Sequence, residues 1–337
     1  MHLIVHIGPF KTGTTSIQRT LHANNALLSA QGIMPFHVGA KQILDLSVRY
    51  AKPEKVLKSN VAMILGDQDE ALLHSEACWQ QLEKTIKAAS APIGILSSEH
   101  FSELGKPEAF FHRLKGFTDK ITVVSYVRDP VDLFLSGFQE EVKGKGSIVL
   151  ARPVEKFRLR YRRFLTFSSA AVGRENLIVR NFDWRNLLNG DVVADFMGIV
   201  GRFHPVPDIK PEKANESLPG AALAYLIKQE QLRNGVFDRA DRQRLFKQML
   251  KSPEVAALPR LRLDSISWEA SIRTKNKPIV DWVNREFLKD QIQLRTEPDT
   301  TLDPKAKPRH EFRDKLSWIM SYLTPEAETL INETLAS

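Results

Sequence analysis

The chain has 337 residues, of which 42% are hydrophobic and 26% charged, and its formal net charge is +8. These are globular values, which exclude a wholly disordered or fibrous chain, and the modest positive excess suits an anionic ligand without choosing its class. The single cysteine, Cys78, excludes an internal disulfide, and no apolar run approaches the ~20 residues of a membrane helix. We therefore expect a soluble cytoplasmic protein with no membrane insertion.

Strands and helices alternate in the prediction for the first 205 residues. Short apolar runs predict strands at 3–7, 92–96, 121–127 and 176–181. Apolar residues at helical spacing predict helices at 16–30, 71–89, 107–116, 130–142 and 153–169. This order predicts an α/β fold of the P-loop type, with three layers and a central, mostly parallel sheet.

The pattern changes after about residue 205, where four prolines interrupt a short stretch. Beyond them the sequence predicts only helices, at 219–233, 239–250, 279–294 and 310–335, with a long loop at 296–309. We therefore expect an α/β core at 1–220 and a helical C-terminal extension at 221–337.

A loop bracketed by Gly8 and Gly13 follows the first predicted strand and precedes a helix. This order is typical of a phosphate-binding loop, because the N–H groups of the loop and the helix N-terminus favour an anion. The two glycines have Walker A spacing, but Thr14 stands where that motif requires lysine, and Lys11 lies inside the loop instead. A lysine there could neutralise the bridging oxygen of a departing group without a metal. The alternative is an ordinary strand-to-helix turn with an exposed lysine.

A second candidate anion site follows the strand at 121–127. Arg128 leaves the carboxyl end of that strand, where open α/β sheets bind ligands. Asp129 and Pro130 suit the cap and the first position of the next helix, and Ser136 lies about two turns into it. Arg128 and Ser136 could hold a second phosphate; the alternative is a surface Arg–Asp pair with an incidental serine.

Taken together, segments 9–16 and 128–138 resemble two motifs of the sulfotransferases that use 3′-phosphoadenosine 5′-phosphosulfate (PAPS). The first is similar to the 5′-phosphosulfate loop of that family and the second to its 3′-phosphate motif. The resemblance covers roughly residues 1–220, with a weaker match at 213–218; the late Arg-Lys-Gly loop of the cytosolic members is not found. It implies that Lys11 assists departure of the phosphate and that Arg128 and Ser136 bind the 3′-phosphate. The 5′-phosphosulfate would be bound by Thr12, Gly13, Thr14, Thr15 and Ser16.

Transfer to a hydroxyl needs a proton acceptor, and the best place for it is the carboxyl end of a strand beside the loop. Glu99 and His100 follow the strand at 92–96. Glu99 is our first choice because the resemblance extends to glycan sulfotransferases that use glutamate, and His100 is second because cytosolic members use histidine. Glu99 serves equally well as a helix cap or a salt-bridge partner. We expect His6, inside the first strand, to be a packed core residue.

The sequence as a whole favours a PAPS-dependent sulfotransferase that releases 3′,5′-adenosine diphosphate and uses no metal. The expected acceptor is a hydroxyl on a carbohydrate, and the oligomeric state is left open. A P-loop kinase using Mg-ATP and a nonenzymatic PAPS- or nucleotide-binding module are the alternatives. The basic stretch 152–163 could attract an anionic acceptor or be a solvated helix face, and neither a nucleic-acid module nor metal-ligand spacing is present.

Overall fold

The structure of the protein is a computed structural model. This structure describes residues 1–36, 46–56, 66–118, 120–145, 154–212, 218–233, 238–263, 266–298 and 312–336. The chain forms two compact units. The first unit comprises Met1–Arg128, Arg160–Asn215 and Trp282–Leu294, and the second comprises Asp129–Leu159, Glu216–Asp281 and Arg295–Ser337. Both units thus draw residues from both sides of position 220.

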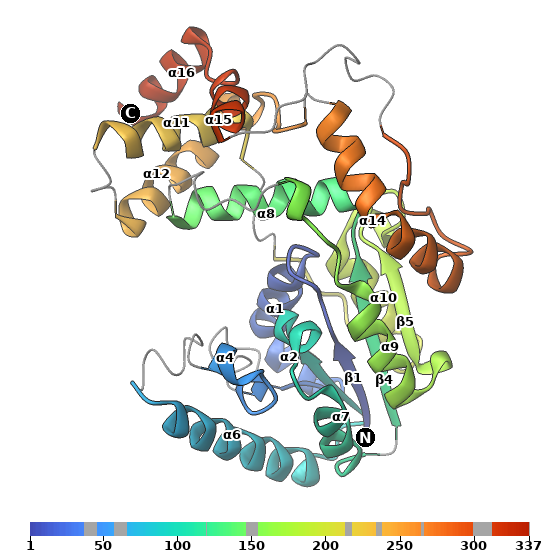
Figure 1. The fold of residues 1–337 in the computed structure, drawn as a ribbon. Helices are drawn as coiled ribbons and strands as arrows, with labels where there is room; N and C mark the ends of the chain where they lie inside the picture. The colour runs from blue at the N-terminus through green and yellow to red at the C-terminus, as the bar shows by residue number, and fades with distance from the viewer. Residues whose placement is uncertain are drawn as a thin grey trace. The chain divides into compact units, whose positions relative to one another are not determined.

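The first unit is built around a parallel sheet of five strands (Figure 1). In sheet order these are β2 (Ile33–Pro35), β3 (Ile93–Ser97), β1 (His2–His6), β4 (Lys120–Val127) and β5 (Leu177–Asn181). Central β1 pairs in parallel with β3 on one side and β4 on the other, and all five of its residues are buried. The chain therefore leaves β1 at the carboxyl edge of the sheet, between the ends of β3 and β4.

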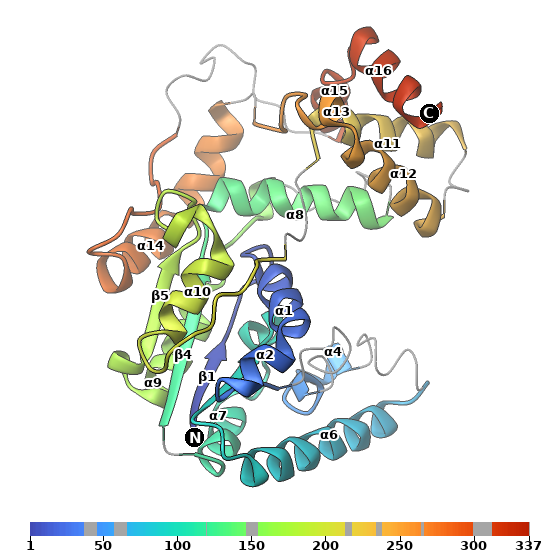
Figure 2. The same cartoon turned by 180° about the vertical axis from the view of Figure 1, so that it is seen from behind.

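Helices cover both faces of this sheet (Figures 1 and 2). On one face, α1 (Thr14–Ala23), α2 (Asn25–Ala30) and α10 (Val192–Val200) contribute to one buried cluster with Ile4 and Val124. On the other face, α7 (Pro107–Lys115) packs against α9 (Tyr161–Val172), which contacts β4 and β5. The α/β prediction of three layers and a parallel sheet is confirmed. Among the described residues, this unit also contains α4 (Pro53–Val56), α6 (Gln68–Ala88), η1 (Glu99–Glu103), η3 (Arg174–Asn176), η4 (Leu188–Gly190) and the last residues of α14 (Ile266–Phe287).

The edge strand β5 is covered by the segment that follows the last turn of α14 (Ile266–Phe287). Gln291 donates from its amide to Val179 O at 2.8 Å and accepts from Asn181 N at 3.2 Å. Asn284 exchanges two hydrogen bonds of 2.9 Å with the backbone of Leu294. The Gln291 contacts satisfy backbone groups at the sheet edge. The helix expected at 279–294 ends instead at Phe287.

The described part of the second unit consists of helices around its own core. Its buried side chains include Leu226, Trp268 and Trp318. After residue 220, every regular element among the described residues is a helix, as predicted. Besides residues 266–281 of α14, this unit contains α8 (Pro130–Lys145), η2 (Val154–Lys156), α11 (Gly220–Leu232), α12 (Arg239–Lys251), α13 (Pro253–Ala256), α15 (Phe312–Met320) and α16 (Pro325–Ala336).

Several element boundaries differ from the sequence prediction. The helix expected at 16–30 is two helices, because the amide of Asn24 turns back to Thr20 O at 2.9 Å. The helix expected at 310–335 breaks before Pro325, where Thr324 caps a new helix by accepting from Ala327 N. The helix expected at 153–169 is η2 followed by α9, and α14 begins at Ile266 and contains Pro278. Strand β2 and helix α10 were not predicted.

Candidate functional site

The loop between β1 and α1 ends in an open helix N-terminus. Gly13 is the N-cap of α1, with φ 81°, and its carbonyl accepts from Ser16 N and Ile17 N at 3.0 and 3.1 Å. As a glycine, Gly13 has no side chain with which to cap α1, and the first turn of α1 contains no acidic residue. The positive end of the helix dipole is therefore not neutralised by a carboxylate on α1 itself, as an anion site requires.

Gly13 is required by its surroundings as well as by its backbone conformation. A Cβ at this position would lie 2.7 Å from Val192 Cγ1 and 3.0 Å from Phe182 Cε2. Both distances are shorter than ordinary carbon contacts of ~3.5–4.0 Å. The start of α1 is therefore held against the loop after β5 and the start of α10 with no room for a side chain.

Lys11, in the middle of the loop, has a left-handed backbone with φ 69°. This conformation costs a residue with a side chain about 1–2 kcal/mol relative to its favoured conformations. The Lys11 carbonyl accepts a hydrogen bond of 2.8 Å from Nη1 of Arg128. The guanidinium at the end of β4 therefore fixes the loop at its most strained residue.

Arg128 is itself held through its backbone. The hydroxyl of Tyr161 accepts from Arg128 N at 3.0 Å and donates to Arg128 O at 2.8 Å. Its guanidinium carbon lies 5.3 Å from the ring centroid of Phe182. The first unit thus brings Lys11, Gly13 and Arg128 together at the carboxyl edge of the sheet.

The hydroxyl groups of Thr12 and Thr14 lie in the protein interior. Thr12 Oγ1 is buried and donates to Pro9 O at 2.7 Å. Thr14 Oγ1 is buried beneath Gly8, close to the ring of His6, and has no hydrogen-bond partner within the structure. Of Thr12 and Thr14, the backbone N–H groups therefore remain the candidates for the predicted contact with the 5′-phosphosulfate. Thr15 and Ser16 are half-buried in the first turn of α1.

Glu99 and His100 begin η1, directly after β3. The amide nitrogen of Gln18, on α1, donates to Ser97 O at 2.8 Å and to Glu99 Oε2 at 3.4 Å. The His100 ring lies edge-on to Phe10 of the loop, with ring centroids 5.3 Å apart. Both candidate proton acceptors are therefore placed at the carboxyl edge, Glu99 through α1 and His100 through the loop.

His6 lies beneath this site and is fully buried. Its Nδ1 is 2.8 Å from Ser97 Oγ, while Nε2 has no partner within the structure. Burial lowers the pKa of His6 to about 3, so the ring is neutral near pH 7. His6 is a core residue, as expected from the sequence.

The remaining predicted residues belong to the second unit or fall outside the described residues. Asp129 caps α8, since its Oδ1 accepts from Val131 N at 2.9 Å, and Pro130 is the first residue of that helix. Ser136 lies on α8 in the second unit, so its role remains a prediction. Residues 213–217, from the weaker sulfotransferase match at 213–218, fall outside the described residues, and so does Arg152 of the basic stretch.

The arginines of the basic stretch that belong to the first unit make contacts within it. Arg160 approaches Glu103 at 3.9 Å, and the Arg162 guanidinium carbon lies 4.9 Å from the Trp282 ring. Arg163 donates to Leu104 O at 3.0 Å. These residues therefore have a structural role as well as their charge.

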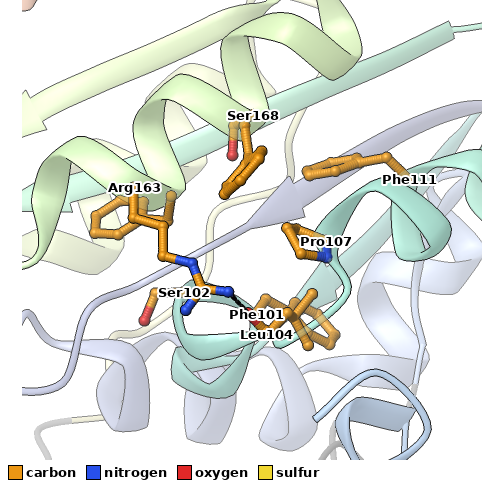
Figure 3. A pocket seen from close by; sticks show the side chains of 9 residues that line it. Phe101, Ser102, Leu104, Pro107, Phe111, Arg163 and Ser168 are labelled. Carbon is orange, nitrogen blue, oxygen red and sulfur yellow. Dashed lines mark hydrogen bonds between the residues drawn. The ribbon is translucent and has the colours of Figure 1, made fainter. Parts of the chain in front are cut away.

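A small pocket lies between η1, α7 and α9 (Figure 3). Its free space is about 10 Å³, room for about one water molecule. The pocket is thus almost filled by its own side chains, and we do not assign it to a substrate. It is lined by Phe101, Ser102, Leu104, Pro107, Phe111, Arg163, Phe164, Phe167 and Ser168.

Among the described residues, no cluster of three or more His, Cys, Asp and Glu side chains could hold a metal ion. A transmembrane helix is also not found in the described ranges, where no helix is long and apolar enough to cross a bilayer.

No protein-family model matches the chain, and no curated protein matches it. Among solved structures the chain is similar to one described as "Crystal Structure of Sulfotransferase from Alicyclobacillus acidocaldarius", with 16% identical residues and a TM-score of 0.38. The match covers 69% of this chain and 94% of that one. Because identity and TM-score are this low, we draw neither the fold nor the activity from this similarity.

Three residues of the site were missed in the sequence. Gln18 lies one helical turn after Thr14, a spacing that places the two on one face of α1 and could have indicated it. Tyr161 and Phe182 carry no local signal, because their partners lie far away along the chain.

Proposed function

We propose that this protein is a sulfotransferase that moves the sulfuryl group of PAPS to a hydroxyl acceptor and releases 3′,5′-adenosine diphosphate. The observation that carries the proposal is Lys11, whose strained backbone is held by Arg128 beside an open helix N-terminus. Strain at a polar residue is typical of functional sites.

The residues present fit a phosphate and sulfate donor. Gly13 leaves no room for a side chain, so the backbone can approach an anion closely. Lys11 and Arg128 supply two positive charges at this end of the sheet, and α1 adds no acidic residue in its first turn. When bound, PAPS would supply the activated sulfuryl group. Backbone N–H groups from Thr12 to Ser16 would bind its 5′-phosphosulfate, and Arg128, with Ser136, its 3′-phosphate.

In the proposed reaction the acceptor oxygen forms a bond to sulfur while the bond between sulfur and the bridging phosphate oxygen breaks. The electron pair of the broken bond stays on that oxygen, where the Lys11 ammonium stabilises the developing charge. Glu99 takes the proton of the acceptor hydroxyl, and Gln18 holds its carboxylate in place. His100 is the second candidate for this proton.

The kinase alternative fits these residues less well. Thr14 occupies the place of the Walker lysine, so the loop lacks the ammonium group that would reach the β- and γ-phosphates of ATP from that position. A purely nucleotide-binding module would not need a lysine held in an unfavourable conformation. An aliphatic sugar hydroxyl is the acceptor we propose, because such a hydroxyl requires the general base that Glu99 offers.

Calorimetry tests the choice of donor. Titration with 3′,5′-adenosine diphosphate and with ATP, each with Mg²⁺ and with EDTA, should show metal-independent binding of the former and much weaker binding of the latter. Tight, metal-dependent ATP binding would instead establish the kinase. A screen of glycan acceptors with labelled PAPS then tests the acceptor class, and transfer to none of them while phenols are sulfated would exclude the carbohydrate.

A further inference from the structure

Tyr161 lies on α9 and is 1% exposed, and its hydroxyl makes two hydrogen bonds with the backbone of one residue. It accepts from Arg128 N at 3.0 Å and donates to Arg128 O at 2.8 Å. Arg128 is the first residue after β4, where the chain has left the sheet, so the strand ladder no longer pairs its backbone. One phenol therefore supplies both hydrogen-bond partners that the sheet does not.

The side chain of Arg128 links this residue in turn to the loop after β1. Nη1 of Arg128 donates to the carbonyl of Lys11 at 2.8 Å, and Lys11 has φ 69°. A hydrogen-bonded path thus runs from α9 through the backbone and side chain of Arg128 to the strained residue of the loop. All three residues belong to the first unit.

We infer that Tyr161 is a positioning residue that acts through Arg128 to hold the loop in its left-handed conformation at Lys11. This inference rests on the proposed function only for the identity of the ligand. If it is correct, removing the hydroxyl loosens Arg128, and the loop loses the donor that fixes the Lys11 carbonyl. Tyr161 itself touches no reacting atom in this scheme.

The variant that isolates this role is Tyr161→Phe, which keeps the buried ring and removes only the hydroxyl. Tyr126→Phe is the matched control, because Tyr126 is equally buried on β4 and donates a single hydrogen bond of 2.9 Å to Asp195. Amide hydrogen exchange of residues 8–16 in the ligand-free protein reports on the loop without any ligand. We expect Tyr161→Phe to accelerate this exchange roughly tenfold, the effect of one lost buried hydrogen-bond partner. Tyr126→Phe should leave it nearly unchanged.

A double-mutant cycle separates positioning from general stability. If Tyr161 acts through Arg128, then Tyr161→Phe should add little to the loop exchange of Arg128→Ala, since coupled residues are not additive. Additive effects would overturn the inference. So would an acceleration in Tyr161→Phe that extends equally to β1 and β5, because that pattern means global loss of stability.

Binding of 3′,5′-adenosine diphosphate gives the second readout, with a roughly tenfold loss expected for Tyr161→Phe and none in the Arg128→Ala background. If the unaltered protein binds no 3′,5′-adenosine diphosphate, the proposed function fails, and the exchange experiment still decides the role of Tyr161.

Discussion

Replacement of Gly13 by alanine tests the geometry at the start of α1. Alanine at φ 81° costs about 1 kcal/mol relative to glycine, through the backbone alone. The added Cβ would also lie 2.7 Å from Val192 Cγ1 and 3.0 Å from Phe182 Cε2, and overpacking of this kind typically costs a further ~1–3 kcal/mol. We therefore expect Gly13→Ala to lower the free energy of unfolding by about 2–4 kcal/mol.

Gly66 offers the matched control, because its φ is 79° but a Cβ there would have no atom within 4 Å. Gly66→Ala should therefore show the backbone cost alone, about 1 kcal/mol, or ~2–4 °C in Tm for a unit of this size. The difference between the two variants in urea unfolding isolates the packing cost. Because a displaced Phe182 no longer supports the Arg128 guanidinium, only Gly13→Ala should also weaken binding of 3′,5′-adenosine diphosphate. Equal losses of stability in the two variants, with nucleotide binding intact, would refute this account of the loop.

Three further predictions concern individual side chains of the site. Glu99→Gln should keep cofactor binding and lower turnover with sugar hydroxyls by ~10²–10⁴-fold in a radiolabel transfer assay. Near-full activity of Glu99→Gln, together with loss of activity in His100→Ala, would show that His100 is the general base. Arg128→Ala should weaken the binding of 3′,5′-adenosine diphosphate by roughly 10–100-fold in calorimetry. Binding of 5′-AMP should weaken less, because 5′-AMP has no 3′-phosphate and depends on Arg128 only through the loop that Arg128 supports. Equal losses for both ligands would show that Arg128 is a structural residue. The His6 pKa of about 3 lies below the unfolded value of 6.5, so the folded state binds fewer protons and stability is lost as pH falls through this window. Between pH 7 and pH 5 this loss is roughly 2 kcal/mol. In urea unfolding curves measured at the two pH values, His6→Gln should remove this part of the stability difference. An unchanged difference would show that His6 is already accessible to protons.

The parts of the fold that the sequence predicted are those with strong local patterns. Strands β1, β3, β4 and β5 are found within one or two residues of the predicted ranges, because a strand covered on both faces is an almost uninterrupted apolar run. Strand β2 has only three residues, too few for any period to appear. Helix α10 was missed although Asp191 caps it by accepting from Val193 N and Ala194 N, a start signal that was present in the sequence.

The site divides in the same way. Lys11, Gly13 and Arg128 were identified as candidates in the sequence because a glycine-bracketed loop and a strand end are local features with characteristic spacing. The contacts of Arg128 with Lys11 and Tyr161 were not, because they join residues 117 and 33 positions apart and depend on which strands are neighbours. The Thr14 side chain illustrates a further limit, because the sequence identifies a hydroxyl but does not show that it is buried.

Under the proposed function, stability and function make opposite demands at Lys11. A turn that needed only a left-handed residue would be more stable with glycine, so a lysine there is costly unless its ammonium is used. Lys11→Gly should therefore raise the free energy of unfolding by roughly 0.5–1 kcal/mol, after allowance for the greater freedom of glycine in the unfolded chain. It should at the same time abolish transfer to every acceptor, because charge develops on the bridging oxygen whatever attacks sulfur. Lys11→Ala is the paired control, since it removes the ammonium but keeps the strain, and it should lose activity with no gain in stability. Near-normal turnover in Lys11→Gly would show that this lysine does not act on the leaving group, and a loss of stability would show that the backbone at Lys11 is not strained.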